Sequence, residues 1–518
     1  MKQILFTLIT IVLSFHVPAQ DIKVIPYPSS VSVQKGSISI PENVVFRSTN
    51  FSSLLSYFNT ALSPGNKSRP QRDIDLSITG NGVPGSYRLS TLDKTINISG
   101  TDTAGVMNGL VTLLQLCKTA TPAAHRLVLP RLTILDTPRY GWRGVMLDES
   151  RHFFGRQQVE QLLDWMAFYK LNKFHWHLTD ANGWRIEIKK YSLLTSIGGR
   201  GNFSDSTASA QYYTQKEIRD IVEYAGQRGI AVIPEIDMPG HATAANHAYP
   251  QFSGGFTKGY PDFTFNPASE ETYTFITDLF RELLPLFPAH IIHMGGDEVA
   301  LGIKAWAENP TIRTRMKELG YTDLTQMEHY FLRRVADSLI RLGGTLVCWD
   351  EAVTANLPVE KTIITWWRHN LPETLADALG RGYHIILCPR LPMYFDFVQD
   401  STHRSGRKWG GLFNSYLDVY DFPDDKMAPG TQPDKQILGT QANLWTETVA
   451  SVKRLQFLLF PRIAALAEAA WSTKENKSHS SFDARLKAQL PLYDRSGLYY
   501  YDPFDPDNHP EPIDISKH

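Results

Sequence analysis

The sequence predicts an α/β fold, a (β/α)8 TIM barrel preceded by a small α+β domain. Eight short apolar segments recur after residue 138, and each ends in polar or aromatic residues. Several are separated by segments with helical periodicity, and this alternation is typical of a barrel of parallel strands. The eight segments are WRGVMLDES, KFHWHLTD, IAVIPEIDMPGH, HIIHMGGDE, TLVCWDE, KTIITWW, YHIILCP and ILGTQANLW.

The part of the chain before the barrel has a different pattern. SVSVQKGSISI and TINISG alternate apolar and polar residues as half-buried strands do, whereas DTAGVMNGLVTLLQLC has the period of a helix. These features predict the α+β domain. The predicted boundaries are 21–137 for this domain, 138–474 for the barrel, and 475–518 for a C-terminal helix and tail that pack on the barrel.

The first 20 residues have the features of a cleaved secretory signal peptide. Lys2 precedes an apolar stretch from Ile4 to Phe15, and small residues follow near Ala19. The stretch is too short for a membrane span. We therefore expect an exported protein, periplasmic or secreted, that is not held in a membrane.

Two linkers between the apolar segments are irregular. The fifth and sixth segments leave little room for a full helix, and residues 401–435, between the seventh and eighth, are polar, glycine-rich and aromatic rather than helical. We interpret both linkers as loops over the active face of the barrel. A homodimer in which residues 401–435 of one subunit cover the site of its neighbour stays open as an alternative.

Charge and cysteine content exclude several classes of function. With 52 basic and 53 acidic residues the formal net charge is −1, so no long-range field attracts nucleic acid or an anionic membrane. Cys117, Cys348 and Cys388 are far apart and form no CxxC pair, so neither a disulfide framework nor a zinc site is indicated, although one stray pair stays open.

The ends of the eight segments are rich in carboxylates and indoles. In a barrel of this type the functional residues lie at the C-terminal ends of the strands. Carboxylates accept hydrogen bonds from hydroxyls and indoles pack on apolar faces, and a sugar ring presents both surfaces. The leading hypothesis is a saccharide pocket. The candidates are Asp148, Glu149, Arg151, Asp180, Asp237, His241, Asp297, Glu298, Trp349, Asp350, Glu351, Trp366, Trp367, Tyr394, Asp396, Trp445 and Glu447.

Each of these residues also has a structural interpretation. Helix capping is the default for Asp148 and Asp237, and a single tryptophan at a strand end is as often part of the core as of a ligand site. His175, His177, His241 and His293 also lie in or near strand ends, which makes a metal-dependent hydrolase a rival hypothesis. The tryptophans fit a sugar better than a metal-bound small molecule, and we expect no metal.

Six motifs, in order along the chain, resemble those of family 20 glycoside hydrolases, the β-N-acetylhexosaminidases. The resemblance covers about residues 21–471 and includes the small domain before the barrel. It implies an exo-acting hydrolase that needs no cofactor and binds glycans ending in N-acetylhexosamine. The motifs are DESRHFF (148–154), WHLTDANGWR (176–185), PEIDMPGH (234–241), HMGGDE (293–298), CWDE (348–351) and LWTE (444–447).

The resemblance implies substrate-assisted catalysis, in which the 2-acetamido group of the substrate is the nucleophile. Glu298 is then the general acid and base, with a pKa raised by a partly apolar pocket, and Asp297 accepts the amide N–H. Neighbouring side chains on an extended backbone point to opposite faces, so we expect these two carboxylates to have different aims. Tyr394 donates to the acetamido oxygen.

The remaining roles follow from the same motif positions. Trp349, Trp445 and one of the pair Trp366 and Trp367 enclose the acetamido methyl group, while Arg151, Asp396 and Glu447 bind ring hydroxyls. Asp180, His241 and His293 are expected to orient Glu298. Two alternatives stay open: a relative that releases a disaccharide such as lacto-N-biose, and an amino-sugar-binding protein without turnover. The natural glycan, and the preference for GlcNAc or GalNAc, also stay open.

Overall fold

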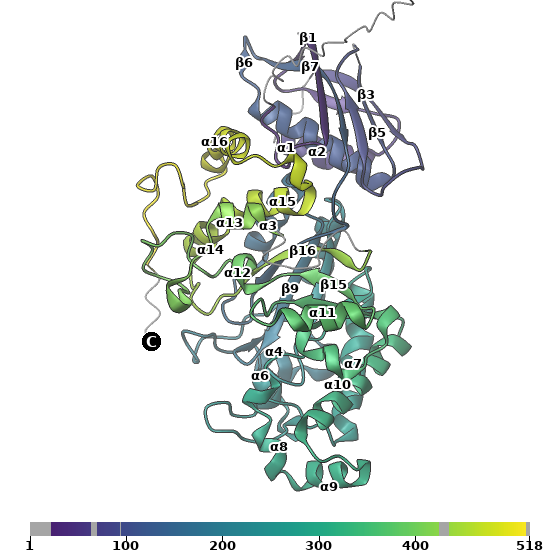
Figure 1. The fold of residues 1–518 in the computed structure, drawn as a ribbon, viewed down its shortest axis with the longest axis vertical. Coiled ribbons are helices and arrows are strands. Elements are labelled where there is room, and N and C mark those ends of the chain that lie inside the picture. Colours follow the sequence, from purple (N-terminus) through teal and green to yellow (C-terminus); the bar gives the residue numbers. More distant parts are fainter. Residues whose placement is uncertain (1–21, 64–69, 94, 424–434, 514–518) are drawn as a thin grey trace, which may run out of the picture.

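The computed structural model describes residues 22–63, 70–93, 95–423 and 435–513, which form a mixed β-sheet domain and a closed barrel (Figure 1). The predicted signal peptide, residues 1–20, lies outside the described residues. Within the described ranges, no helix combines the length and the apolar character needed to cross a bilayer.

The N-terminal sheet has the strand order β1-β7-β4-β5-β3-β2, with β6 beside β7. Its pairs are antiparallel from β1 to β5 and parallel from β5 to β2. Helix α2 packs on β5, and its first turn is capped by the carboxylate of Asp102, which accepts the Gly105 N–H at 2.7 Å. The elements are β1 Ser30–Pro41, β2 Val45–Arg47, α1 Ser52–Leu62, β3 Gln71–Ile78, β4 Tyr87–Ser90, β5 Ile96–Gly100, α2 Thr103–Thr119, β6 Pro122–Ala123 and β7 Arg126–Asp136.

The eight apolar segments form the strands of a closed parallel barrel, as predicted. Each strand pairs with the next in the chain, and the last strand pairs with the first, from Gly439 beside Trp142 to Leu444 beside Leu147. A short strand, β10 (Gly183–Trp184), pairs antiparallel with β9. The barrel strands are β8 Trp142–Asp148, β9 Lys173–Asp180, β11 Ala231–Ile236, β12 Ile291–His293, β13 Thr345–Trp349, β14 Thr362–Trp366, β15 His384–Leu387 and β16 Ile437–Leu444.

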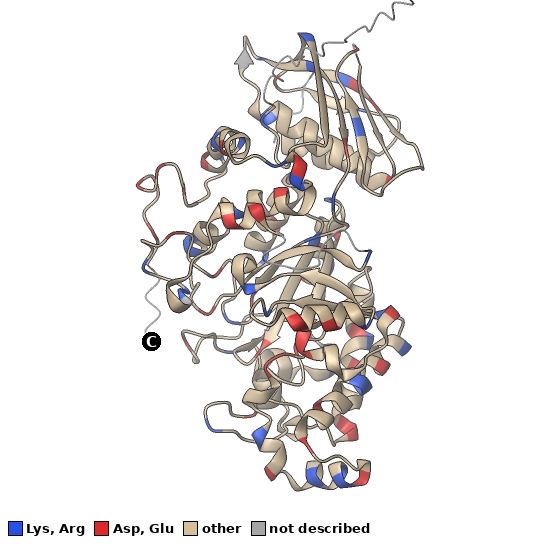
Figure 2. Cartoon of the chain, viewed as in Figure 1, with Lys and Arg blue, Asp and Glu red and all other residues tan. Residues whose placement is uncertain are grey.

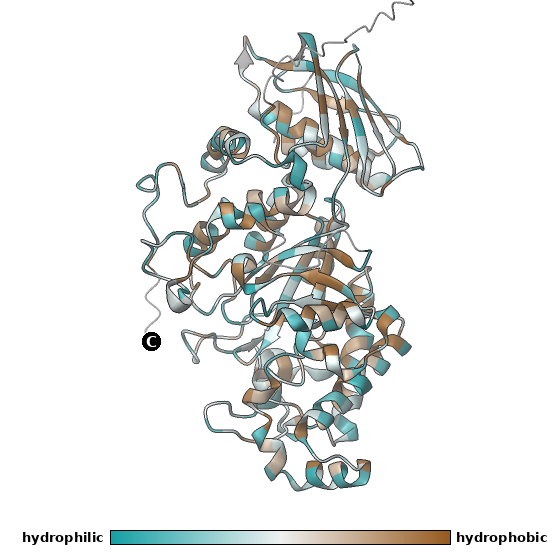
Figure 3. Cartoon of the chain, in the orientation of Figure 1, coloured by the Kyte–Doolittle hydropathy of each residue, from teal (hydrophilic) through white to brown (hydrophobic). Residues whose placement is uncertain are grey.

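Side chains alternate between the barrel interior and the surrounding helices. Trp142, Ile233, Val347 and Ile386 pack together as one apolar cluster inside the barrel. Residues on the opposite face of the strands, such as Ile364, join the large core shared with the helices. Both faces of the barrel strands are covered, so apolar strands such as β15 suit this position, although Figure 3 shows that other barrel strands also carry hydrophilic residues.

Helices surround the barrel between most strand pairs. The predicted lack of a full helix between the fifth and sixth strands is confirmed, because only 3-10 turns, at Asp350–Ala355 and Val359–Lys361, lie there. The principal helices are α3 Arg156–Phe168, α5 Gln215–Gly226, α7 Glu270–Leu283, α10 Leu324–Arg341, α11 Pro372–Gly380, α14 Val452–Leu459 and α15 Arg462–Trp471. Shorter helices in the loops are α4 Leu193–Ser196, α6 Thr243–Ala248, α8 Lys304–Glu308, α9 Pro310–Leu319 and α12 Arg390–Met393.

The linker between the seventh and eighth strands differs from its prediction in one respect. It contains a helix, α13 (Tyr416–Asp421), within the stretch expected to be free of helices. Ser415 caps this helix: its hydroxyl accepts the Asp418 N–H, and the Asp418 carboxylate accepts the Ser415 N–H in return. Six residues are too few to give a helical period in the sequence.

The C-terminal helix α16 (His479–Arg495) contacts both parts of the molecule, whereas the sequence placed it on the barrel alone. Arg485 forms an ion pair with the buried Glu468 at 2.9 Å and donates to the Val24 carbonyl at 3.0 Å. Gln489 donates to the Lys23 carbonyl at 2.9 Å. The first described residues are therefore bonded to the C-terminal helix.

The surface charges have no single-sign face in the view of Figure 2, where basic and acidic residues alternate along the outer helices. This distribution agrees with the near-zero net charge of the chain. Cys117, Cys348 and Cys388 are all buried and free, so the pairing left open by the sequence is not present.

Candidate active site

A small pocket of about 60 Å³ lies at the C-terminal ends of the barrel strands. Most of the residues predicted for the site line it, contributed by loops that follow different strands. A site assembled in this way depends on closure of the barrel. The lining consists of Arg151, Asp180, Asp237, His241, Asp297, Glu298, Trp367, Arg390, Tyr394, Arg407, Trp445 and Glu447.

Asp297 and Glu298 point to the same partner, which corrects the expectation of opposite aims. Strand β12 ends at His293, so neither carboxylate lies on an extended strand. Glu298 has a left-handed backbone with φ of 50°, a conformation that residues other than glycine rarely adopt. This turn brings Asp297 Oδ2 to 3.8 Å and Glu298 Oε2 to 3.7 Å from Nε2 of His241.

The glycines before these carboxylates allow a close approach of the backbone to Asp237. Gly295 has φ of 68°, and a Cβ atom there would lie 1.7 Å from Asp237 Oδ1. A side chain at this position would displace Asp237 from the pocket. Asp237 caps no helix, contrary to the default interpretation; it lines the pocket, and its backbone N–H donates to the Thr179 hydroxyl at 3.1 Å.

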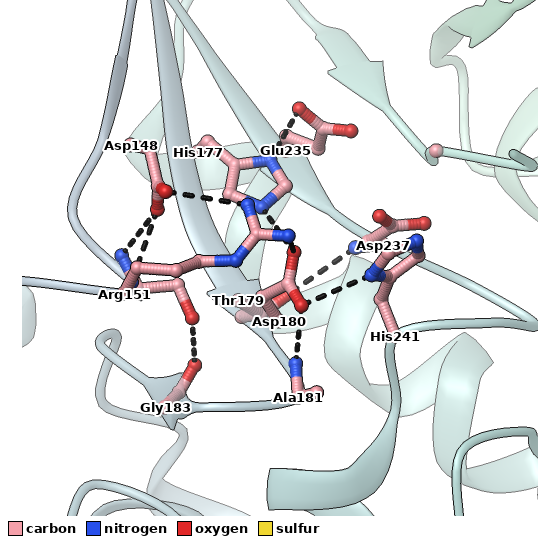
Figure 4. A network of polar contacts seen from close by, with 12 residues as sticks. Asp148, Arg151, His177, Thr179, Asp180, Ala181, Gly183, Glu235, Asp237 and His241 are labelled. Atoms are coloured by element: carbon pink, nitrogen blue, oxygen red, sulfur yellow. Dashed lines mark hydrogen bonds and ion pairs between the residues drawn. The ribbon is translucent and has the colours of Figure 1, made fainter. Parts of the chain in front are cut away.

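A hydrogen-bonded chain leads from Glu235 in the barrel interior to His241 (Figure 4), and Nε2 of His241 lies 3.8 Å from Asp297 and 3.7 Å from Glu298. His177 lies between Glu235 Oε2, at 2.6 Å, and Asp180 Oδ2, at 2.9 Å. The other oxygen of Asp180 contacts Nδ1 of His241 at 3.0 Å. The predicted role of Asp180 and His241 in orienting Glu298 agrees with this geometry, whereas Glu235 and His177 were not among the predicted site residues.

The charges along this chain set its protonation. Burial lowers the pKa of His241, but the carboxylates of Asp180 and Asp297 outweigh burial and raise that pKa to about 9. Burial and the carboxylate of Asp237 raise the pKa of Asp297 well above its ordinary value. Asp237, Asp297 and His241 bring ligand atoms within 4.8 Å of one another, and burial and the neighbouring carboxylates of Glu235 and Asp180 also raise the pKa of Asp237 well above its ordinary value.

Arg151 is held rigidly at the edge of the pocket. Its guanidinium bonds Asp180 at 2.8 Å and Asp148 at 3.2 Å, and lies 5.1 Å from the ring centroid of Trp445. Asp148 also accepts the Arg151 N–H at 3.1 Å and the Thr446 N–H at 3.1 Å. Asp148 therefore joins the loops after the first and last barrel strands instead of capping a helix.

Aromatic side chains form one wall of the pocket. Tyr394 stacks on Trp367 with ring centroids 6.2 Å apart and lies 6.0 Å from Trp445. Trp349 packs behind Trp445 at 5.9 Å and is only 1% exposed, so it lies beneath the lining rather than in it. Its indole N–H donates to Glu235 at 2.9 Å, which ties this wall to the chain of charged residues.

The structure decides between the two neighbouring tryptophans. Trp367 lines the pocket and donates its indole N–H to Glu351 at 3.0 Å. Trp366 is fully buried in the large core outside the barrel, so its prediction as a substrate-binding residue is wrong. The alternation along β14 explains this result: Thr365 bonds His293 inside the barrel, and its neighbour therefore points outward.

Asp396 and Glu447 are linked by an arginine that the motifs did not identify. Arg407 contacts Asp396 at 2.8 Å and Glu447 at 2.9 Å, and lines the pocket together with Glu447. Asp396 is 1% exposed and lies behind this arginine, where burial raises its pKa to about 7 against the opposing charge of Arg407. Arg407 and Arg390 lie in or beside an irregular linker, where no strand pattern singles them out.

His293 lies deeper than expected. Its imidazole contacts Glu235 at 3.1 Å and Thr365 at 2.9 Å, and packs on Trp349 at 4.7 Å between ring centroids. It supports the indole beneath the aromatic wall, and its link to Glu298 passes through Glu235 and the chain of charged residues.

Among the residues that the structure describes, three groups of histidine and acidic side chains are close enough to suggest metal ligation: His175 with Glu235 and His293, His177 with Asp180 and Asp237, and His241 with Asp237 and Asp297. The ring nitrogens of the first two groups are engaged by protein partners. Nδ1 of His175, for example, contacts the Gln441 amide at 2.9 Å, and both nitrogens of His177 contact carboxylates. A cation in either group would have to displace these hydrogen bonds.

Comparison with known proteins agrees with this geometry. Residues 140–474 match the catalytic domain of glycosyl hydrolase family 20, and residues 21–137 match domain 2 of that family. A β-hexosaminidase of Vibrio furnissii is 37% identical over 412 residues, which are 75% of this chain and 66% of that protein. A β-hexosaminidase of Porphyromonas gingivalis is 33% identical over 430 residues, 80% of this chain and 54% of that protein.

The chain spans 66% of the length of the Vibrio furnissii protein and 54% of the length of the Porphyromonas gingivalis protein, so both relatives extend beyond the matched region. A solved structure extends the likeness to three dimensions. The family 20 exo-β-N-acetylglucosaminidase of Vibrio harveyi, in complex with N-acetylglucosamine, superposes with a TM-score of 0.84 at 31% identity, over 93% of this chain and 79% of that one. Because both family models match in order and together include most of the chain, the chain belongs to glycosyl hydrolase family 20.

Proposed function

We propose that this protein is a retaining exo-β-N-acetylhexosaminidase, which releases terminal β-linked GlcNAc or GalNAc by substrate-assisted catalysis. The observation that carries the proposal is the convergence of Asp297 and Glu298 on His241 beside the aromatic wall of Trp367, Tyr394 and Trp445. A pair of carboxylates with one shared orienting group fits a reaction that needs one acid and one acceptor for an amide N–H.

In the first step, the carbonyl oxygen of the 2-acetamido group attacks the anomeric carbon. Asp297 accepts the amide N–H and stabilises the positive charge that develops on the resulting oxazolinium ring. Tyr394 donates its hydroxyl to the acetamido oxygen, and the aromatic wall holds the group against the anomeric carbon. Glu298 protonates the leaving oxygen, so that the glycosidic bond breaks without a free alkoxide.

In the second step, Glu298 removes a proton from water as the water oxygen attacks the anomeric carbon, and the bond between that carbon and the acetamido oxygen breaks, which opens the oxazolinium ring. Two displacements at the anomeric carbon retain its configuration. The side chain of Glu298 is 45% exposed, which leaves it access to the leaving group and then to water. Asp297, with a side chain 12% exposed, faces the enclosed part of the pocket, where the acetamido group would lie.

The opposite side of the pocket suits the hydroxyls of one terminal sugar ring. Arg151 and Glu447 line the pocket with their charged ends, and Arg407 connects Glu447 to Asp396. The pocket is small, about 60 Å³, which favours one sugar residue over a chain that passes through it. Exo action is the consequence.

The test is hydrolysis of paired aryl β-glycosides, one with a 2-acetamido group and one with a 2-hydroxyl group. We expect cleavage of the acetamido substrate alone, inhibition by a thiazoline that mimics the oxazolinium ring, and no change with a chelator. Cleavage of both substrates at similar rates would refute substrate assistance. Loss of activity with the chelator would favour the metal-dependent alternative.

We also propose that the protein is exported after removal of its first 20 residues or so. The support is the sequence, with Lys2, the apolar stretch and Ala19 in the order of a signal peptide. Expression of the full chain, followed by N-terminal sequencing of the extracytoplasmic product, tests this. A product that still begins at Met1 would contradict it.

A further inference from the structure

A single loop carries the arginine that holds Asp396 and Glu447 in place. Residues 395–414 leave the barrel after the seventh strand, and Arg407 lies in the middle of this loop. The base of the loop is fixed from the barrel side, because Arg462 of α15 donates to the carbonyls of Phe395 at 2.6 Å and Asn414 at 3.2 Å. These bonds leave the far end of the loop to be held by something else.

The C-terminal segment holds that far end. The carboxylate of Glu511 accepts the backbone N–H groups of Arg404 at 2.6 Å and Ser405 at 2.9 Å. It also pairs with Arg454 of α14 at 3.0 Å, and Arg454 donates in turn to the Ser405 carbonyl. The Glu511 side chain is only 14% exposed, and that of Arg454 is fully buried.

The bonded residues and the pocket arginine are close neighbours in the chain. Ser405 is separated from Arg407 only by Gly406, which has a positive φ of 110°. The Arg407 N–H donates to the Asp396 carbonyl at 3.3 Å, and the Arg407 carbonyl accepts the Val398 N–H at 3.2 Å. A shift of the loop at Ser405 would therefore move the Arg407 guanidinium and, with it, the carboxylates of Asp396 and Glu447.

We propose that Glu511 is a positioning residue of the sugar pocket, which acts through the 404–407 loop on Arg407. The segment that carries it lies beyond residues 140–474, the part that matches the family's catalytic domain. The proposal rests on the proposed function for the identity of the sugar. Its consequence is that the end of the chain tunes recognition of the sugar ring, while bond cleavage is left to Asp297 and Glu298.

A double-mutant cycle tests this route. Glu511→Ala removes an acceptor of charge-assisted hydrogen bonds, and we expect KM for an aryl 2-acetamido-β-glucoside to rise by about 5-fold with kcat within about 2-fold. In an Arg407→Ala background the same change should raise KM by less than about 1.5-fold, because the group it positions is gone. An equal rise in both backgrounds, or none in the otherwise unchanged protein, would overturn the proposal.

A second readout separates positioning from a loss of stability. The ratio of kcat/KM for the gluco and galacto substrates should change in Glu511→Ala, since Arg407 and Glu447 in the pocket lining move, whereas partial unfolding lowers both values alike. Asp507→Ala, an exposed acidic residue of the same segment, is the matched control and should leave the ratio unchanged. If Glu511→Ala does not fold, Glu511→Gln keeps an acceptor oxygen and is carried through the same cycle.

The cycle also has a form that does not depend on turnover. If the unmutated protein cleaves no acetamido glycoside, the proposed function fails, and binding of GlcNAc is then measured by calorimetry. Glu511→Ala should weaken that binding by about 5-fold, and the weakening should again disappear in the Arg407→Ala background. Unchanged GlcNAc affinity would overturn the role of Glu511 independently of the reaction.

Discussion

Replacement of Glu235 by Gln should damage both stability and catalysis. Glu235 is fully buried, and its carboxylate contacts the ring nitrogens of His175 at 2.7 Å and His177 at 2.6 Å and the indole N–H of Trp349 at 2.9 Å. An amide has one acceptor oxygen and one donor group. Whichever way the amide is oriented, its NH2 group faces either the indole N–H of Trp349 or the imidazole N–H groups.

The size of the effect follows from these contacts. Removal of one partner from a buried charge pair costs about 3–5 kcal/mol, and an unpaired buried indole N–H about 1–3 kcal/mol. His177 can lose its proton once the negative charge is gone, which recovers part of this cost. We therefore expect the free energy of unfolding to fall by about 3 kcal/mol in a urea titration followed by tryptophan fluorescence.

Catalysis should fall as well, because Glu235 fixes both Trp349 beneath the aromatic wall and His177 in the chain to His241. A decrease of about 30-fold in kcat/KM corresponds to about 2 kcal/mol of lost transition-state stabilisation. Asp136→Asn is the matched control. Asp136 is a buried carboxylate that bonds Lys170 at 3.2 Å and the Trp471 indole at 2.9 Å, among residues that do not line the pocket.

Asp136→Asn should destabilise the protein to a similar degree and leave kcat/KM within about 3-fold of the unmutated value. The reasoning would be refuted if Glu235→Gln changed the free energy of unfolding by less than about 1 kcal/mol, or if both variants lost the same fraction of kcat/KM.

Three further outcomes are expected. Glu298→Gln should lower kcat by at least about 100-fold on substrates with poor leaving groups and much less on activated aryl glycosides, since acid catalysis matters most for a basic leaving oxygen; equal losses would remove its role as the acid. The pKa of His241 is about 9, above the ordinary 6.5, so its stabilising contribution is complete below pH 6.5 and lost as pH rises through 9. The free energy of unfolding and kcat/KM, both measured between pH 6 and 10, should fall at the alkaline end. A His241→Asn variant that showed the same fall would exclude His241 as its source. Trp367→Phe should raise KM by about 10-fold with little change in stability, whereas Trp366→Phe should lower stability by about 1–3 kcal/mol with KM unchanged; steady-state kinetics and urea unfolding of both variants would show the reverse if the pocket were lined by Trp366.

The recurrence of eight short apolar segments, each bounded by polar residues, was enough to predict the barrel. The pattern is clear because both faces of each barrel strand are covered. The predicted site residues at strand ends lie together for the same reason. Arg407 and Glu511 could not be found in this way. Their positions depend on a loop and a tail whose paths are fixed by tertiary hydrogen bonds, which leave no period in the sequence.

Burial and orientation were also hard to predict. Trp366 and Trp367 are adjacent and identical in type, and only the register of β14 decides which of them faces the pocket. The aims of Asp297 and Glu298 were mispredicted because the strand ends at His293 and Glu298 adopts a left-handed backbone. Glu235 lies within an apolar segment, so the sequence did not indicate which side chains its carboxylate contacts. Those side chains come from three other strands.

The bonds between residues 23–24 and helix α16 bear on how the chain acquires its structure. Lys23 and Val24 are among the first described residues, whereas Arg485 and Gln489 are more than 450 positions later, at separations of 461 and 466. Contacts this distant along the chain form late and slowly. During synthesis the segment that carries Lys23 and Val24 must wait, without these partners, until helix α16 has been made. That interval is when a chaperone or a protease would find it accessible.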